Sequence, residues 1–181
     1  SPSWGQASSK VNMNFEQADI GQLVKIVSEA TGERFVVSES IAMTKVTVVT
    51  PGMIEKKDVL PLFLRILEGS GYTVIEKDGV LHLTAVPNQG GLMAPLDDGK
   101  GRAVGYVSRI FKLNHISAVE LQKALQPLVR GGQQGSVIAF PLSNHLIVSD
   151  TAANIDQVGK IIDALDLEGA SGIYEVLALK H

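Results

Sequence analysis

Apolar and polar residues alternate in the stretch "VNMNF", where Val11, Met13 and Phe15 are separated by two asparagines. A period of two predicts a strand with one buried face. The next stretch, "ADIGQLVKIVSEATG", has a helical period instead, with Asp19 as the expected N-cap and Gly32 as the stop signal. The expected buried stripe of this helix is Ile20, Leu23, Val24 and Val27.

Two further strands, "RFVVS" and "KVTVV", precede a second predicted helix in "IEKKDVLPLFLRILEGSG". We place the start of this helix near Asp58, because Pro61 is tolerated only in a first turn. The stretch "YTVIEKDGVLHLTAV" predicts two strands around an Asp-Gly pair, which is a strong hairpin signal. The expected order βαββαββ defines a first domain at residues 11–86, after a disordered start or cloning scar at 1–10.

Residues 87–105 are rich in glycine and lack a periodic apolar face, so they predict a flexible linker. A second domain is expected at 106–170 and begins with the strand "YVSRIFKL". Ser117 and Glu120 then have the spacing of a capping box before the helix in "AVELQKALQPLVR". The expected buried face of that helix is Ala118, Leu121, Leu125 and Leu128.

The strands "SVIAF" and "HLIVS" and a last helix complete the second domain. The helix is expected to open near Asp150 or Thr151. Its buried stripe should be Ile155, Val158, Ile161, Ile162 and Leu165. A βαββα unit of roughly 60 residues buries its surface incompletely. We therefore expect such a unit to pack beside neighbours.

The chain repeats part of itself. Residues 173–181 read "IYEVLALKH", and residues 107–115 read "VSRIFKLNH". In both, a leucine stands two places before a closing histidine, His115 or His181. Internal repeats indicate stacked or recurring modules. We interpret 171–181 as the first strand of a further, truncated repeat.

The composition fits an α+β fold in two small domains. The chain has 181 residues, 45% of them hydrophobic, and contains no cysteine. It lacks the run of roughly 18 apolar residues that a membrane span needs. Residues 1–88 carry 8 Lys+Arg against 10 Asp+Glu, and residues 106–181 carry 6 against 7. Neither half has the basic excess that binds phosphate.

Candidate catalytic chemistry is sparse, and we expect no enzyme activity, cofactor or metal. The four histidines lack a second ligand at metal spacing. The stretch "HLIVSD" contains His145, Ser149 and Asp150, but a strand sends alternate side chains to opposite faces. The Gly132–Gly135 sequence "GQQG" is similar to the loop of KH domains, yet only Arg130 flanks it and a strand follows, so we expect no nucleic-acid partner.

The candidate partner-binding site is the strand "VNMNF" itself. A strand at the edge of a small sheet offers unpaired backbone groups that accept a partner strand. The candidate residues are Val11, Asn12, Met13, Asn14 and Phe15.

Both domains resemble a family. "NFEQADIGQLVKIVSEATGERFVVS", "KVTVVT" and "GYTVI" are similar to the first periplasmic domain of bacterial secretins, which is also the signalling domain of TonB-dependent receptors. "IFKLNHISAVELQKALQPLV" with "SNHLIVSDTAANIDQVGKIIDALD" resembles the repeated KH-like domain of secretins. The order of the two domains is a more specific sign of the family than either domain alone.

The resemblance implies the periplasmic, ring-forming region of an outer-membrane channel for type II protein secretion in a Gram-negative bacterium. Expected partners are an inner-membrane component of the secretion system, the secreted substrate proteins and further copies of the chain. The membrane would be reached only through a C-terminal barrel outside this sequence. Three alternatives remain open: a secretin of a type IV pilus or type III system, a TonB-dependent receptor signalling fragment, and a KH-type nucleic-acid-binding module.

Overall fold

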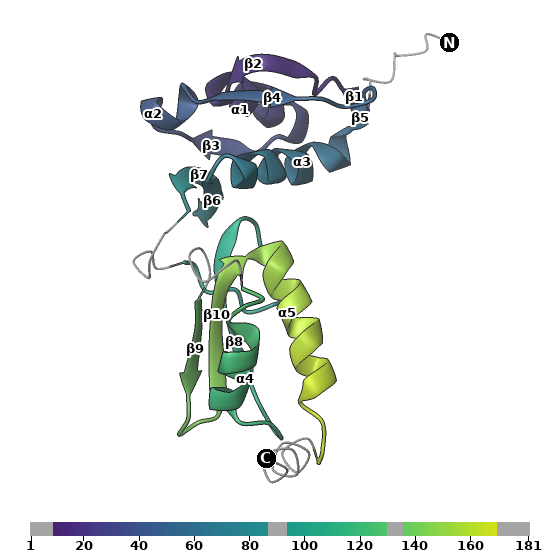
Figure 1. Ribbon diagram of the computed structural model, residues 1–181. Coiled ribbons are helices and arrows are strands. Elements are labelled where there is room, and N and C mark those ends of the chain that lie inside the picture. The colour runs from purple at the N-terminus through teal and green to yellow at the C-terminus, as the bar shows by residue number, and fades with distance from the viewer. Residues whose placement is uncertain (1–8, 87–93, 130–135, 170–181) are drawn as a thin grey trace, which may run out of the picture. The chain divides into compact units, whose positions relative to one another are not determined.

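The computed structural model describes residues 9–86, 94–129 and 136–169. The described chain folds as two units, one within residues 1–86 and the other within 87–181. Both mix small sheets with helices, so the predicted α+β class is confirmed (Figure 1). None of the helices in the described ranges is long and apolar enough to cross a membrane.

The first unit consists of two main helices and several short strands packed around them. Its elements are β1 (Lys10–Val11), β2 (Phe15–Asp19), α1 (Ile20–Thr31), β3 (Arg34–Val36), α2 (Glu39–Ala42), β4 (Lys45–Val48), β5 (Ile54–Glu55), α3 (Lys56–Gly69), β6 (Tyr72–Lys77) and β7 (Val80–Ala85). The strands pair as β1–β5, β2–β4 and β3–β7–β6. Helices α1 and α3 pack against each other, and Phe63 meets Phe35 edge to face at 5.7 Å between ring centroids.

The first helix and the hairpin match their predictions. The stripe expected in α1 is buried, Asp19 is its N-cap, and Gly32 ends it with a φ of 77°. Such a left-handed conformation costs glycine little, because it has no Cβ. In the β6–β7 turn, Asp78 and Gly79 both have positive φ, as a type I′ hairpin turn requires.

The strand predicted at 11–15 is interrupted. Val11 ends β1 and Phe15 begins β2, while the three residues between them are not in a strand. Asn12 accepts a hydrogen bond from the Asn14 backbone N–H at 3.0 Å. Asparagine side chains favour such local turns over a continuous strand. The prediction of one uninterrupted strand was therefore wrong.

Two further boundaries of the first unit also differ. Helix α3 begins at Lys56, so Pro61 lies in its second turn rather than its first. The expected disordered start at 1–10 is wrong for its last residues: Lys10 pairs with Glu55, and the Ser9 carbonyl accepts a hydrogen bond from Lys56 N–H at 2.9 Å. Residues 1–8 lie outside the described residues.

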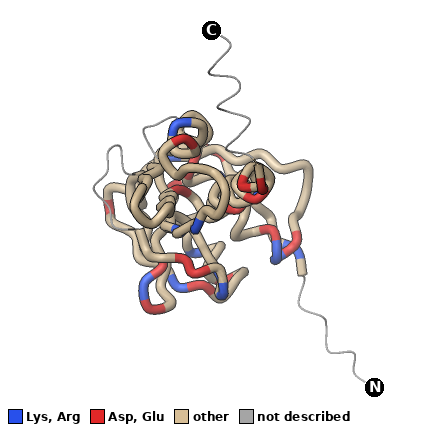
Figure 2. The backbone as a smooth tube through the Cα atoms, turned by 90° about the horizontal axis from the view of Figure 1, so that it is seen from below, with Lys and Arg blue, Asp and Glu red and all other residues tan. Residues whose placement is uncertain are grey.

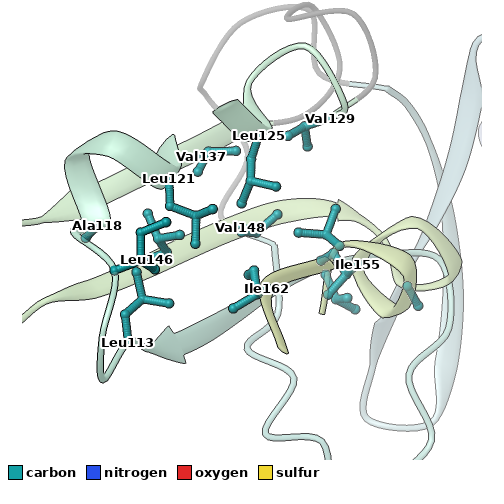
Figure 3. Packing of buried hydrophobic residues seen from close by; sticks show 14 residues of the cluster. Leu113, Ala118, Leu121, Leu125, Val129, Val137, Leu146, Val148, Ile155 and Ile162 are labelled. Carbon is teal, nitrogen blue, oxygen red and sulfur yellow. The ribbon is translucent and has the colours of Figure 1, made fainter. Parts of the chain in front are cut away.

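The second unit is a three-stranded antiparallel sheet covered on one face by two helices. Its elements are β8 (Tyr106–Lys112), α4 (Ala118–Leu125), β9 (Ser136–Phe140), β10 (His145–Thr151) and α5 (Ala152–Leu165). The strand order is β8–β10–β9, so β10 is central. Leu121, Leu125 and Val148 point toward one another in the core between sheet and helices (Figure 3).

Helix α4 departs from its prediction at both ends. Leu128 was expected on the buried face but is 51% exposed, because the helix ends at Leu125 and Val129 fills the core instead. Ser117 makes no side-chain capping bond, so the predicted capping box was wrong. The Asn144 side chain takes its place and accepts the Ala118 N–H at 2.8 Å.

The residues predicted as linker are partly bound to the second unit. Pro95 O accepts the Ser108 N–H at 2.9 Å, and Asp97 N–H donates to Ser108 O at 2.8 Å. The Asp97 carboxylate also forms an ion pair with Arg109. The start of this segment is thus not a free linker, because residues 95–97 are joined to β8 by backbone hydrogen bonds and an ion pair. Residues 87–93 lie outside the described residues.

Candidate partner-binding surfaces

The five predicted binding residues have different surroundings. Met13 is fully buried, so it belongs to the core of the first unit and cannot contact a partner. Val11 pairs with Ile54 through β1, and Asn14 accepts the Thr50 N–H at 2.7 Å through its side chain. The stretch therefore does not form one free edge. Asn14 and Phe15 alone line a surface groove.

This groove lies over β2 and β4. Its lining residues are Asn14, Phe15, Glu16, Gln17, Thr47, Val48 and Val49. We call it the β2–β4 groove. Among the described strands, β2 and β4 pair only with each other, so each has a long side without a further strand neighbour. Unpaired strand sides are the places where an extended partner segment adds to a sheet.

A bulge shapes the floor of the groove. Phe15 pairs with Val48 and Ala18 with Val46, so two residues of β2 oppose Thr47 alone. Gln17 has a φ of 51° within this bulge, and its N–H donates to the Thr47 hydroxyl at 3.1 Å. Positive φ is uncommon for residues with a Cβ, and bulges often occur beside functional sites.

Val49 at the end of the groove is 85% exposed. Val46 and Val48, which precede it in the sequence, are buried. The sequence signal for this residue was the last valine in "KVTVV", which breaks the alternation of apolar and polar positions. That signal was missed, because an extra apolar residue at a strand end has several structural explanations.

The second candidate surface is apolar and lies on the outer face of the second unit's sheet. Ile147 in the central strand β10 pairs with Ile110 of β8 and with Ile138 of β9. Their neighbours Leu146, Val148 and Val137 point to the helices and are buried. The three isoleucines therefore form a row across the uncovered face, with Ile110 and Ile138 about half exposed. We call this row the isoleucine face.

The loop between β8 and α4 is held by two polar side chains. The Asp166 carboxylate accepts backbone N–H groups of Asn114, His115 and Ile116 at 2.9, 2.7 and 3.0 Å. Burial by itself raises the pKa of Asp166, but these three donors outweigh it and hold the pKa below its usual value. Asn144 donates to the carbonyls of Leu113 and Ile116 from the other side.

The candidate triad in "HLIVSD" does not assemble. Ser149 lies on the outer sheet face, where its hydroxyl is 2.6 Å from that of Ser108. Asp150 points inward, is fully buried and accepts the Thr151 N–H. Within the described ranges there is no cluster of three His, Cys, Asp or Glu side chains able to hold a metal ion. The "GQQG" sequence lies outside the described residues.

Charges are dispersed along the described chain. Figure 2 shows lysine and arginine interspersed with aspartate and glutamate along the described residues, without a large positively charged patch. Arg109 lies in β8 on the face of the sheet that the helices cover. Its charge is neutralised by ion pairs with Asp97 and Asp156. A surface of this kind offers little attraction for a phosphate backbone.

Both halves of the chain match family models. The model described as "GspD-like, N0 domain" matches residues 13–83. The model described as "Bacterial type II/III secretion system short domain" matches residues 108–171. The two matches therefore fall on the two folded units.

Curated relatives are secretins. Secretin XcpQ of Pseudomonas aeruginosa is 30% identical over 182 residues, which is 99% of this chain and 26% of XcpQ. Putative secretin GspD of Escherichia coli K12 is 30% identical over 159 residues, covering 86% of this chain and 24% of GspD. The chain thus spans about a quarter of the length of these relatives.

A solved structure has the same fold. It is a chain of the Klebsiella pneumoniae type II secretion system outer membrane complex, which includes PulD, PulS and the PulC HR domain. The TM-score is 0.62 at 23% identity, covering 86% of this chain and 26% of that chain. The two family models and the curated relatives together show that the chain belongs to the secretin family and carries domains of the type II kind.

Proposed function

We propose that this region works in the periplasm as the docking and ring-forming part of a type II secretin channel. It contacts an inner-membrane component of the secretion system and the exported protein, and it carries out assembly rather than chemistry. The observation that carries the proposal is a pair of surfaces, one on each unit: the unpaired strand sides at the β2–β4 groove and the apolar isoleucine face. They lie in a chain whose described residues offer no metal cluster and no assembled triad.

The β2–β4 groove is the proposed docking site for the inner-membrane component. An extended segment that pairs with an open strand side gains main-chain hydrogen bonds, and its side chains cover Phe15 and Val49. A relevant precedent is the Klebsiella complex, in which a PulC HR domain accompanies PulD. Of the five residues predicted to bind a partner, 11–15, the proposed docking site keeps Asn14 and Phe15. It also includes Val49.

The isoleucine face is the proposed contact between copies in a ring. Helix α4 exposes Val119, and Leu128 follows it just beyond the helix end. An apolar sheet face on one copy and an apolar helical surface on the next form a head-to-tail contact. Contacts of this heterologous kind close into rings when the rotation permits.

A titration tests the docking site. The 181-residue chain would be titrated by calorimetry with the periplasmic region of the inner-membrane component of the same secretion system. We expect saturable binding that Val49→Asp weakens at least tenfold. Met43→Asp is the matched control, because Met43 is 65% exposed in the same unit but lies outside the groove.

Each outcome has a clear meaning. Equal loss of binding in both variants would contradict the groove assignment. Absence of binding by the unmodified chain, together with binding to a regulator of a TonB system, would favour the signalling-receptor alternative for the first unit. Salt-sensitive RNA binding would favour the nucleic-acid alternative instead.

A further inference from the structure

A short segment that precedes β8 adds a strand to the sheet of the second unit. Residues 95–97, which we call the strap, lie parallel to β8, with Leu96 paired to Ser108. Ser108 N–H donates to Pro95 O at 2.9 Å, and Asp97 N–H donates to Ser108 O at 2.8 Å. Because β8 is an edge strand of the sheet, the strap covers backbone groups that would otherwise be open to another strand.

Charged side chains from three elements hold the strap in place. The Asp97 carboxylate accepts a hydrogen bond from Arg109 Nε at 2.8 Å, and only 6% of the Asp97 side chain is exposed. Arg109 also pairs with Asp156 of α5, at 3.0 Å between Nη1 and Oδ1. Burial by itself raises the pKa of Asp97, but the hydrogen bonds from Arg109 and the Gly99 N–H outweigh it and hold the pKa below its usual value. The bound strap therefore carries a charged Asp97.

The strap itself gives a further strand little to pair with. Pro95 has no backbone N–H, and proline at a sheet edge opposes strand addition. After Asp97 the chain turns, because the side chains of Asp97 and Asp98 accept the N–H groups of Gly99 and Lys100, each at 2.9 Å. Gly99 has a φ of 73°, a conformation that glycine adopts at little cost. The strap thus ends the sheet instead of extending it.

The opposite edge of the sheet is protected by a side chain. Successive residues of a strand point their backbone groups to opposite sides. Ser108 points to the strap, so Arg109 points to Val148 in the central strand. Val137 of β9 pairs with Val148 from the other side, and its backbone groups therefore point away from β10. Gln122 of α4 donates to Val137 O at 2.9 Å. At each edge, a carbonyl that an incoming strand would use is already bonded.

We propose that the strap is a releasable strand that closes the β8 edge against pairing with a second copy of the chain. Copies held together at high local concentration are the partners most able to add a strand to an open edge. With the strap bound, copies meet through the uncovered isoleucine face; with the strap released, pairing at β8 competes with that contact. The inference rests on the proposed function, because it concerns regulation of the proposed contact between copies.

Hydrogen exchange tests how the strap is held. The substitution Asp97→Asn keeps the shape of the side chain and removes its charge. We expect the Ser108 amide to exchange about tenfold faster or more, because a hydrogen bond to a charged group contributes that much to local closure. The Phe111 amide, which belongs to the pairing with β10, should keep its rate. Asp98→Asn is the matched control, since Asp98 is exposed beside Asp97 and its carboxylate accepts the nearby Lys100 N–H.

Sedimentation velocity tests what the strap prevents. We expect the double variant Asp97→Asn, Ile138→Lys to associate at submillimolar concentration, because an edge contact does not need the isoleucine face. Ile138→Lys alone, with the strap bound, should stay monomeric. Should Asp97→Asn unfold the second unit, Asp156→Asn takes its place in both experiments. Asp156 is 61% exposed and supports the strap only through Arg109, so its loss should accelerate Ser108 exchange by a smaller factor.

Two results would overturn the inference. Unchanged Ser108 exchange in both Asp97→Asn and Asp156→Asn would show that the ion pairs do not hold the strap. A monomeric double variant would show that the opened β8 edge does not pair with a second copy, and that any association of Asp97→Asn alone uses the isoleucine face. Neither result would affect the groove titration or the behaviour of Ile138→Lys alone, which test the proposed function separately.

Discussion

At the scale of single residues, the Asn144 side chain joins the β9–β10 turn to the end of β8 and the start of α4. The sequence around Asn144 does not indicate these contacts. Its side chain accepts the first N–H of α4 from Ala118 and donates to the carbonyls of Leu113 and Ile116. Its φ of 52° is left-handed, a conformation that asparagine adopts more readily than most residues. One amide thus satisfies both a helix end and a loop, and it needs both a donor and an acceptor to do so.

The substitution Asn144→Asp tests this double role. Aspartate keeps an oxygen for Ala118 N–H, but it cannot donate to the two carbonyls, which would then face a carboxylate. We expect the second unit to lose about 1–3 kcal/mol of its free energy of unfolding, because buried acceptors lose their partners. Urea unfolding of Ser143→Ala, an exposed neighbour in the same turn, provides the control. A loss no larger than that of the control would contradict the role assigned to Asn144.

At the scale of elements, Asp166 joins the end of α5 to the β8–α4 loop. We expect Asp166→Asn to lower the free energy of unfolding of the second unit by about 1–3 kcal/mol at pH 7, because hydrogen bonds to a charged acceptor are the stronger kind. Asp163→Asn is the matched control, since Asp163 is exposed on the same helix. Equal stability of the two variants in urea would contradict the anchoring role.

The lowered pKa of Asp166 predicts that the stability of the second unit depends on pH. Its pKa is lower in the folded unit than in the unfolded chain, where aspartate titrates near about 3.9. Its contribution is therefore fully present above that pH and is lost as the pH falls through the folded pKa. We expect the stability difference between the unmodified chain and Asp166→Asn to shrink below about pH 4. A difference that stays constant down to pH 2 would show that the carboxylate charge plays no part.

Helix α4 offers a direct test of its core. Leu125 is fully buried, whereas Leu128, which the apolar pattern placed on the same face, is half exposed. We expect Leu125→Asp to unfold the second unit, because it removes about 1.5–3 kcal/mol of apolar burial and introduces a charge. Leu128→Asp should change the free energy of unfolding by about 0.5 kcal/mol or less. Calorimetry with hydrogen exchange would show which unit melts, and unfolding of the first unit by either variant would contradict independent cores.

The sequence predicted elements whose signals are local. Helix α1 carries its N-cap, its stripe and its terminal glycine within fifteen residues, and the β6–β7 hairpin is determined by its Asp-Gly turn. It did not predict contacts that depend on the tertiary fold. Asp166 meets a loop about fifty residues earlier, and Asn144 replaces Ser117 as the cap of α4. The β2–β4 groove was only partly predicted, because burial of Met13 depends on how β1 and β2 enter the core.

At the scale of the whole molecule, the proposed ring depends on how copies are joined. The isoleucine face is a row of three side chains, and joining copies to a common structure would raise their local concentration to the millimolar range. Weak contacts would therefore suffice in the proposed ring. The 181-residue chain, which covers about a quarter of its relatives, is expected to be monomeric at micromolar concentration. Sedimentation velocity from micromolar to submillimolar protein should reveal association only at the upper end.

The substitution Ile138→Lys tests which surface carries this association. Ile138 is half exposed in an edge strand, so a lysine there keeps the core intact while placing a charge in the row. We expect the association at high concentration to disappear in this variant and to persist in Leu96→Lys, because Leu96 is exposed on the same unit but outside the row. Persistence in both variants would move the contact to another surface. A stable oligomer at micromolar concentration would contradict the view that the contacts are individually weak, because such an interface would hold copies together without a shared anchor.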